Sequence, residues 1–196
     1  MASEARVTSI WKNQKLFVSL ALLAMGGWFF VDGKYVWPRS NDRWKAHDQF
    51  EKEKRLGEWP AHAAGRGWKE EPPEKYYDKD QIFMQFMLAT VLGVIGGITL
   101  IYWAGQRNRI LKLDGDTLHT PAGTELPLSA ITGLGLKKWE SKGLAKVRYE
   151  VAGKKGEFTL DDYKFDRDPT HEIMKAIEAH LVSRNTPGTD GGLIAG

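Results

Sequence analysis

Histidines are the side chains of this sequence best suited to acid–base or metal chemistry near neutral pH. The chain has five of them, His47, His62, His119, His171 and His180. None lies three or four residues from another, which is the spacing that stacks two metal ligands on one helix face. His171 and His180 are nine residues apart, so a helix would direct them to opposed sides. The spacing therefore predicts no metal site.

The other candidates for catalysis are carboxylates that precede an expected helix, namely Asp161, Asp162, Asp166 and Asp168. Carboxylates favour such positions as turn and capping residues because a helix N-terminus carries partial positive charge. The sequence has no cysteine, which excludes thiol nucleophiles, disulfides and iron–sulfur ligation. It also has no glycine-rich phosphate loop, nucleophile elbow or zinc-ligand spacing. We expect no enzymatic activity and no cofactor.

A group of lysines in the last third of the chain could contact an anionic lipid surface or a protein partner. These are Lys137, Lys138, Lys142, Lys154 and Lys155. Glu140, Glu150 and Glu157 lie among them and cancel most of the local field, which favours a solvated strand face instead. The whole chain has 28 Lys and Arg against 25 Asp and Glu, and its net charge of +3 is too small to indicate nucleic-acid binding.

Tryptophans form a second set of candidate contacts, in the charged stretch 32–81. Trp44, Trp59 and Trp68 could rest at a membrane interface, where amphipathic rings are common, or could anchor a protein partner. The first interpretation is favoured because membrane segments flank this stretch. Ser40 is expected to cap a helix over 41–56. The run Glu70-Glu71-Pro72-Pro73 is expected to form a stiff, non-helical approach to the next segment.

The segment that organises the chain is the uncharged run 82–105. As a helix it would extend about 36 Å, and a bilayer's hydrocarbon core is about 30 Å thick. Mean hydropathy over the whole chain is only −0.42, so much of the rest must lie in water. We predict a transmembrane helix here.

A second predicted span covers 11–31, with aromatic residues crowded at its far end. The alternative is a cleavable signal peptide with Ala24-Met25-Gly26 as its cleavage site. The apolar run continues past that site through Trp28, which favours an uncleaved span. Basic residues precede the first span and follow the second, so both termini are expected in the cytoplasm and the loop 32–81 in the periplasm.

Three small residues, Ala89, Gly93 and Gly97, recur every four positions in the second span. Such a stripe lets another helix approach closely. The partner helix could be the first span, or a second copy of the chain in a weak homo-oligomer. Packing within the chain is favoured because the first span is tethered at high effective concentration.

From Arg109 onward the pattern changes to short alternating runs between turn residues, which predicts β-strands. Apolar residues Ile173, Ile177 and Leu181 then mark one face of a C-terminal helix that ends near Arg184. We predict a small antiparallel β-meander over 107–184 capped by that helix, followed by a glycine-rich disordered tail over 185–196. With the two-span segment 1–106, the fold class is an α+β membrane protein.

Three local features of this region resemble bacterial pleckstrin-homology-like domains that are fused to membrane helices. They are the run Leu126-Pro127-Leu128-Ser129-Ala130-Ile131, the hairpin across Trp139–Tyr149 and the helix Thr170–Leu181. The resemblance covers about Arg109 to Arg184 and implies a seven-stranded barrel, whereas about six strands are evident. It also implies a bacterial inner-membrane location.

Two functions fit these features. The first is a membrane-anchored protein-interaction or scaffold module, with a PH-like domain at the inner face of the membrane and an unknown protein partner. The second is an accessory structural subunit of a larger membrane complex, in which the tryptophans of the loop make the contacts. Neither predicted span has a buried ionisable residue to mark a pathway, which disfavours a transporter or sensor.

Overall fold

The computed structural model describes residues 2–185, so the predicted disordered tail lies outside the described residues except for Asn185. The chain divides into two compact units. The helical unit is Leu16–Ile101, and the β-rich unit combines residues 2–15 with residues 102–185. Each unit is described separately below.

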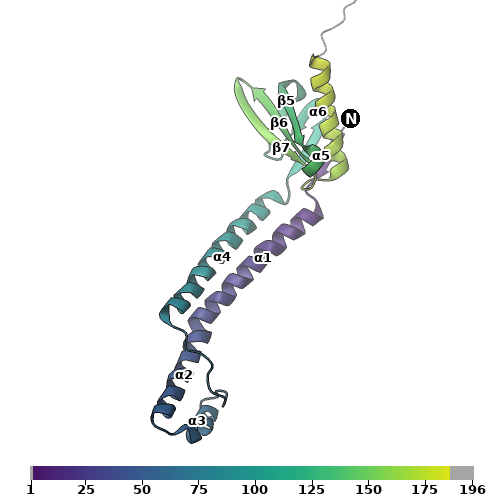
Figure 1. Ribbon diagram of the computed structural model, residues 1–196. Coiled ribbons are helices and arrows are strands. Elements are labelled where there is room, and N and C mark those ends of the chain that lie inside the picture. Colours follow the sequence, from purple (N-terminus) through teal and green to yellow (C-terminus); the bar gives the residue numbers. More distant parts are fainter. Residues whose placement is uncertain (1, 186–196) are drawn as a thin grey trace, which may run out of the picture. The chain divides into compact units, whose positions relative to one another are not determined.

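The first long helix begins earlier and extends much further than the predicted span. Helix α1 (Ser9–Val31) passes through a π-helical turn, η1 (Asp32–Val36), into α2 (Trp37–Lys52) without a break (Figure 1). At the wide turn, Trp37 N–H donates to Asp32 O, five residues back. Pro38 has no N–H for the usual bond four residues back, and a widened turn accommodates this. The prediction that Ser40 caps a new helix was therefore wrong, because Ser40 lies inside α2.

The segment after α2 folds on its own small core. It contains the short turn η2 (Leu56–Glu58) and helix α3 (Trp59–Gly65). The Trp59 side chain is only 3% exposed, and its Nε1 donates to Glu70 O at 2.7 Å. The rings of His47 and Phe50 pack edge-on against it, with centroids 4.9 and 6.0 Å away. The indole thus links α2, α3 and the segment around Glu70 within the loop 32–81.

Helix α4 (Lys79–Gln106) contains the predicted second span. Within the helical unit it approaches α1 most closely at two glycines. A Cβ built on Gly26 would lie 3.1 Å from Ala89 O, and one built on Gly96 would lie 3.1 Å from Leu23 N. These glycines allow backbone to pack on backbone.

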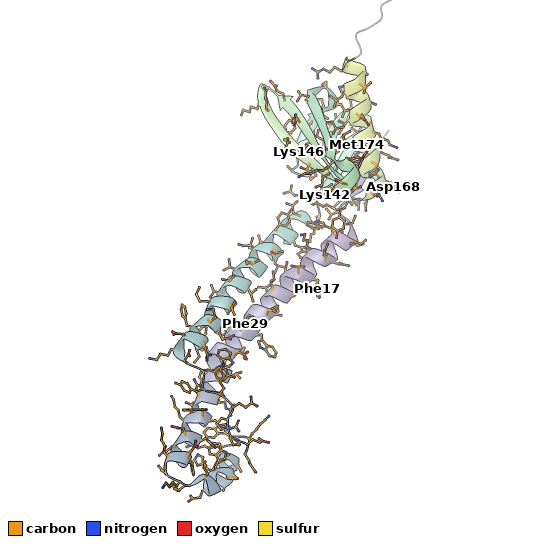
Figure 2. All side chains as sticks on the ribbon, in the orientation of Figure 1. Phe17, Phe29, Lys142, Lys146, Asp168 and Met174 are labelled. Atoms are coloured by element: carbon orange, nitrogen blue, oxygen red, sulfur yellow. The ribbon has the colours of Figure 1, made fainter. Side chains whose placement is uncertain are left out.

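Both helices leave many of their apolar side chains exposed. Phe17 on α1, which is labelled in Figure 2, is 72% exposed. Ile101 on α4 is 75% exposed. Each helix is long and apolar enough to cross a membrane. The core helix of a soluble protein would bury such residues, and these two helices leave most of their apolar windows uncovered.

The β-rich unit contains two antiparallel sheets. The first has strand order β1-β2-β3-β4 and the second β5-β6-β7. The strands are β1 (Ala2–Arg6), β2 (Ile110–Asp114), β3 (Thr117–His119), β4 (Glu125–Pro127), β5 (Ile131–Lys138), β6 (Leu144–Val151) and β7 (Lys154–Asp161). The run Leu126–Ile131 forms the step between the sheets, through the turn η3 (Leu128–Ala130). Among the described residues, strand β4 pairs only with β3 and β7 only with β6, so the predicted closed barrel does not form.

The seventh strand comes from the start of the chain. Strand β1 pairs antiparallel with β2, with Ala5 opposite Leu111. Trp11, which was predicted to begin the first span, is instead buried in the core of the β-rich unit. Residues 2–15 therefore group with the β-rich unit, whereas the sequence analysis placed them in the two-span segment 1–106.

Helix α6 (Arg167–Asn185) covers the core of the β-rich unit and contacts strands of both sheets. Ile173 and Ile177 are fully buried, as their spacing predicts, with Met174 beside them. Arg184 Nη1 donates to Ser129 O at 3.2 Å near the other end of the helix. The short helix α5 (Trp139–Lys142) joins β5 to β6. One core thus joins β1, both sheets and α6.

Candidate functional site: a pocket beside strand β7

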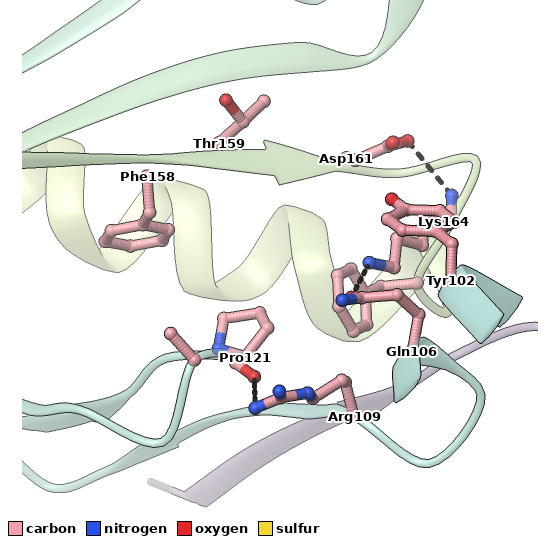
Figure 3. Close-up of a pocket in the computed structure, with 10 residues that line it drawn as sticks. Tyr102, Gln106, Arg109, Pro121, Phe158, Thr159, Asp161 and Lys164 are labelled. Atoms are coloured by element: carbon pink, nitrogen blue, oxygen red, sulfur yellow. Dashed lines mark hydrogen bonds between the residues drawn. The ribbon is translucent and has the colours of Figure 1, made fainter. Parts of the chain in front are cut away.

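A pocket of about 370 Å³ lies in the β-rich unit beside the unpaired edge of β7. Its walls come from five parts of the chain, whose side chains Figure 3 draws. The lining residues are Tyr102 and Gln106 from the end of α4; Arg109, which precedes β2; Pro121 and Ala122 from the turn after β3; Phe158, Thr159 and Asp161 from β7; and Lys164 and Phe165 from the loop that follows β7. The pocket exists because the two sheets do not close upon each other.

Two cations face this pocket, and neutral oxygens accept their hydrogen bonds. Arg109 Nη1 donates to Pro121 O at 2.7 Å, and its Nε donates to Gly105 O at 3.2 Å. Lys164 Nζ donates to the side-chain Oε1 of Gln106 at 2.7 Å (Figure 3). Within residues 2–185, neither cation forms an ion pair with a carboxylate.

Lys164 is partly withdrawn from water, which makes its charge costly, and two aromatic rings offset part of that cost. Its ammonium lies 5.2 Å from the ring centroid of Trp11 and 5.3 Å from that of Phe165. Burial lowers the pKa of Lys164 below its ordinary value; Asp161 opposes that shift and the nearby Arg109 charge adds to it. An anion bound between the two cations would relieve this cost.

Asp161 is the acidic residue of the pocket, and its carboxylate is already engaged. Its Oδ1 accepts backbone N–H bonds from Tyr163 at 3.1 Å and Lys164 at 3.0 Å. It thereby fixes the turn that carries Lys164. The arrangement suits the binding of a carboxylate next to an extended segment; it offers no nucleophile paired with a base, and the described part of the chain contains no cluster of three metal-ligating side chains.

The structure separates the five predicted lysine contacts. Lys137, Lys138 and Lys142 lie at the end of β5 and in α5, next to the start of β6. Lys154 and Lys155 pair with Val151 and Glu150 at the opposite end of β6. Between these groups, Lys146 and Arg148 pair with Glu157 at 2.6 and 3.6 Å. The lysines are exposed but do not form one patch, and their role as contacts stays a prediction.

The predicted aromatic contacts differ in their accessibility. Trp59 is a core residue, so its proposed role as an exposed contact was wrong. Trp44 and Trp68 are half-buried: Trp44 packs against Tyr76 at 5.2 Å, and Trp68 stacks on Trp59 at 6.3 Å. Both still present an accessible edge.

The histidines have structural neighbours. His171 Nε2 lies 3.0 Å from Asp162 Oδ2, and its ring lies 4.8 Å from that of Trp139. Asp162 also faces the Arg167 guanidinium at 3.5 Å. This group links the start of α6 to α5 and to the loop after β7. His47 and His62 both pack into the aromatic core around Trp59.

The predicted small-residue stripe lies only partly against α1. The backbones of Ala89 and Gly93 approach Gly26, but a Cβ on Gly93 or Gly97 would meet no atom within 4 Å. The tightest positions on the facing surfaces are Gly26, Gly33 and Gly96. Helical spacing shows that the small residues share one face of α4. It does not show which face of α4 contacts α1, because that depends on the side chains of α1.

The sequence analysis missed Arg109 and Lys164. Arg109 was counted only as a flanking charge, and Lys164 lies outside the strand pattern. The sequence gives a weak sign of the second: Lys164 is the one basic residue between Asp161 and Asp166, within an acidic and aromatic turn. Their proximity depends on how the two sheets meet, which local patterns do not encode.

Comparison of the chain with protein-family models, with curated proteins and with solved structures gave no match.

Proposed function

We propose that this chain is an integral protein of a bacterial inner membrane that presents its β-rich, PH-like unit at the cytoplasmic face as a protein-interaction module. Both termini are cytoplasmic and residues 32–81 are periplasmic. The module does not catalyse a reaction. It binds an extended segment of a partner protein along β7, with an acidic side chain of that segment between Arg109 and Lys164.

The observation that carries the membrane part is the outward exposure of apolar side chains along α1 and α4. Phe17 and Ile101 are each more than 70% exposed, and lipid is the surrounding that would cover such residues along two whole helices. Basic residues flank both helices on the side of the β-rich unit, which supports the cytoplasmic assignment.

Two features support the interaction part. Within residues 2–185, strand β7 has a neighbour on one side only, and an unpaired strand edge can accept an added strand through backbone hydrogen bonds. Arg109 and Lys164 stand beside this edge without a carboxylate partner in the described chain, which supplies charge complementarity for an acidic segment.

Membrane integration is tested by extraction of isolated membranes at alkaline pH. The full chain should remain in the pellet and be released only by detergent. A reporter fused after Gly196 should be active in its cytoplasmic form only. Release of the chain without detergent would contradict the membrane assignment, and periplasmic reporter activity would contradict the orientation.

Partner binding is tested by photo-crosslinking in intact cells. A photoreactive residue at Thr159, on β7 at the pocket, should crosslink to a partner, and the crosslink should weaken when Lys164 is replaced by Gln. The same residue at Ala179, on the exposed side of α6, is the control and should give no such crosslink. Equal crosslinking at both positions, or no effect of Lys164→Gln, would contradict binding at β7.

The second function, an accessory subunit of a larger membrane complex, is supported by exposed aromatic residues of the helical unit. Trp28 is 70% exposed and Tyr35 lies nearby in sequence, also exposed. Trp44 and Trp68 would add to such contacts through their accessible edges. Purification in mild detergent distinguishes the two: a stoichiometric membrane complex supports the subunit, and a weakly held soluble partner supports the module.

A further inference from the structure

A second pocket of the β-rich unit, of about 290 Å³, has walls that are mostly cationic. Its lining residues are Arg6, Val7, Lys12, Arg107, Asn108, Arg109 and Ile110. Four of these seven carry a positive charge and none carries a negative one. Four cations around one small cavity repel each other unless an anion lies among them.

The arrangement of the chain brings these charges together. Arg6 ends β1, Lys12 lies in the first turns of α1, and the other two cations lie between α4 and β2. Pairing of Arg6 with Ile110 across β1 and β2 places the end of β1 beside the segment that leads from α4 into β2. The pocket therefore lies within the β-rich unit, between the start of α1 and the segment that follows α4.

The cations differ in how firmly they are already held. Arg6 Nε pairs with Glu4 at 2.8 Å, but that pair is exposed and contributes little. The Arg107 guanidinium lies over the Trp103 ring at 4.8 Å, which fixes its position without neutralising its charge. Arg109 is bound to two carbonyl oxygens, and Lys12 has no ion pair within residues 2–185.

We propose that this pocket binds the phosphate group of an anionic membrane phospholipid. Arg6, Lys12 and Arg107 supply the charge, Arg109 forms the shared wall with the β7 pocket, and the Asn108 amide supplies a neutral polar contact. The inference rests on the proposed membrane location, because the ends of two spanning helices lie at the depth of lipid headgroups. A free phosphate compound has the same chemistry, but the position of the pocket at the helix ends favours the lipid.

The apolar residues at the pocket also suit a lipid. Ile110 is exposed at its edge, and Tyr102 and Trp103 form the last aromatic residues of α4 one turn before Arg107. Rings at this position favour the interface between acyl chains and headgroups. A phospholipid could thus place its phosphate among the cations while its chains lie along the helices.

The test uses the full chain, purified in a neutral detergent and stripped of lipid. Bound lipid is counted by native mass spectrometry during titration with phosphatidylglycerol, with phosphatidylcholine or with inorganic phosphate. One or a few phosphatidylglycerol molecules should bind per chain, and they should bind more tightly than phosphatidylcholine. Each single variant, Arg6→Gln, Lys12→Gln or Arg107→Gln, should weaken its binding about fivefold, the effect of losing one nearby cation.

A matched control removes the same charge elsewhere on the β-rich unit. The variant Lys146→Gln/Arg148→Gln/Lys175→Gln changes three exposed cations that do not line the pocket. Its affinity for phosphatidylglycerol should equal that of the unmodified chain, whereas Arg6→Gln/Lys12→Gln/Arg107→Gln should lose at least tenfold. The single variants decide the question if the triple variant fails to fold.

Three results would overturn the inference. The first is an equal loss of affinity for phosphatidylglycerol in the pocket and control triple variants. The second is unchanged affinity in all three single variants. The third is inorganic phosphate that binds as tightly as phosphatidylglycerol. The third result would assign the pocket to a soluble phosphate compound. Alkaline extraction is an independent measurement, so a chain that resists extraction but fails this titration contradicts the lipid pocket alone.

Discussion

Asn41 and Tyr77 are joined by two hydrogen bonds that run in opposite directions. Asn41 Nδ2 donates to Tyr77 O at 2.6 Å, and Tyr77 N donates to Asn41 Oδ1 at 2.8 Å. The Trp37 ring stacks on the Tyr77 ring at 4.3 Å with the planes 13° apart. The side-chain amide thus acts as a backbone partner and fastens α2 to the segment that leads into α4.

Replacing Asn41 by Ala should loosen this segment, because the Tyr77 N–H and C=O groups would both lose their partner. Two lost hydrogen bonds correspond to about 2 kcal/mol of local stability. Amide hydrogen exchange at Tyr77 should therefore be about thirtyfold faster. Ser40→Ala, one residue away, is the control and should leave the exchange rate unchanged. Equal rates in the two variants would show that the amide pair does not hold the loop.

The contact between the two long helices can be tested with neighbouring glycines. Gly96→Leu places side-chain atoms against the backbone of Leu23, whereas Gly97→Leu directs them into open space. Overpacking of this kind costs about 1–3 kcal/mol. The midpoint of thermal unfolding in detergent should fall for Gly96→Leu and stay within a degree or two for Gly97→Leu. A loss at Gly97 instead would indicate a second contact, such as a homo-oligomer.

The elements that the sequence predicted well are those with a strong local pattern. In α4 the signal is a long run without charged side chains, and in α6 it is the helical spacing of Ile173 and Ile177 on one face. Strand β1 was missed because Ala2–Arg6 has a single buried residue, Ala5, and no alternation. It forms a strand because the edge of β2 is available to it, and that edge lies more than a hundred residues away in the chain.

The candidate sites were missed for the same reason. Arg109 and Lys164 meet only through the contact of two sheets, and Arg6 meets Arg107 only through β1. Trp59 was misassigned because an indole in a charged loop has the same local pattern whether it lies at the surface or in a small core. Long-range packing decides each of these cases.

Strand β1 provides a direct test of the division into units. Ala5→Asp would bury an unpaired carboxylate opposite Leu111 and should lower the free energy of unfolding of the β-rich unit by about 3 kcal/mol. Ala2→Asp, on the same strand but exposed, is the control. Calorimetry of the full chain in detergent should show a lower transition temperature for Ala5→Asp only. Identical transitions would mean that β1 contributes nothing to the core.

The packing of α6 is tested by Ile177→Asp. Ile177 is fully buried between α6 and the strands, so the charge would cost several kcal/mol, comparable to the whole stability of a small domain. The cooperative transition of the β-rich unit should disappear, while Ala179→Asp on the exposed side of α6 should retain it. A cooperative transition in both variants would contradict the burial of this face.

The pH dependence of stability should carry a contribution from Lys164. Burial lowers the pKa of Lys164 in the folded chain, whereas the unfolded chain has the ordinary value near 10.5. Between those two pKa values the unfolded state binds more protons, so this residue makes the free energy of unfolding rise as pH increases. Below the folded-state pKa both states are protonated, and the cost of burying the charge is fully present.

The measurement compares the unmodified chain with Lys164→Met from pH 7 to pH 10.5. Methionine fills a similar volume without a charge. It therefore removes the contribution of Lys164 to the pH dependence of stability, along with the hydrogen bond to Gln106. The stability of the unmodified chain minus that of Lys164→Met should be flat below the folded-state pKa of Lys164 and should increase from there up to about pH 10.5. Lys175→Met, at an exposed position of α6, corrects for general charge effects and should give a nearly flat difference. A flat difference for Lys164→Met as well would mean that the ammonium is not desolvated in the pocket, and the case for an anion between Lys164 and Arg109 would lose its electrostatic basis.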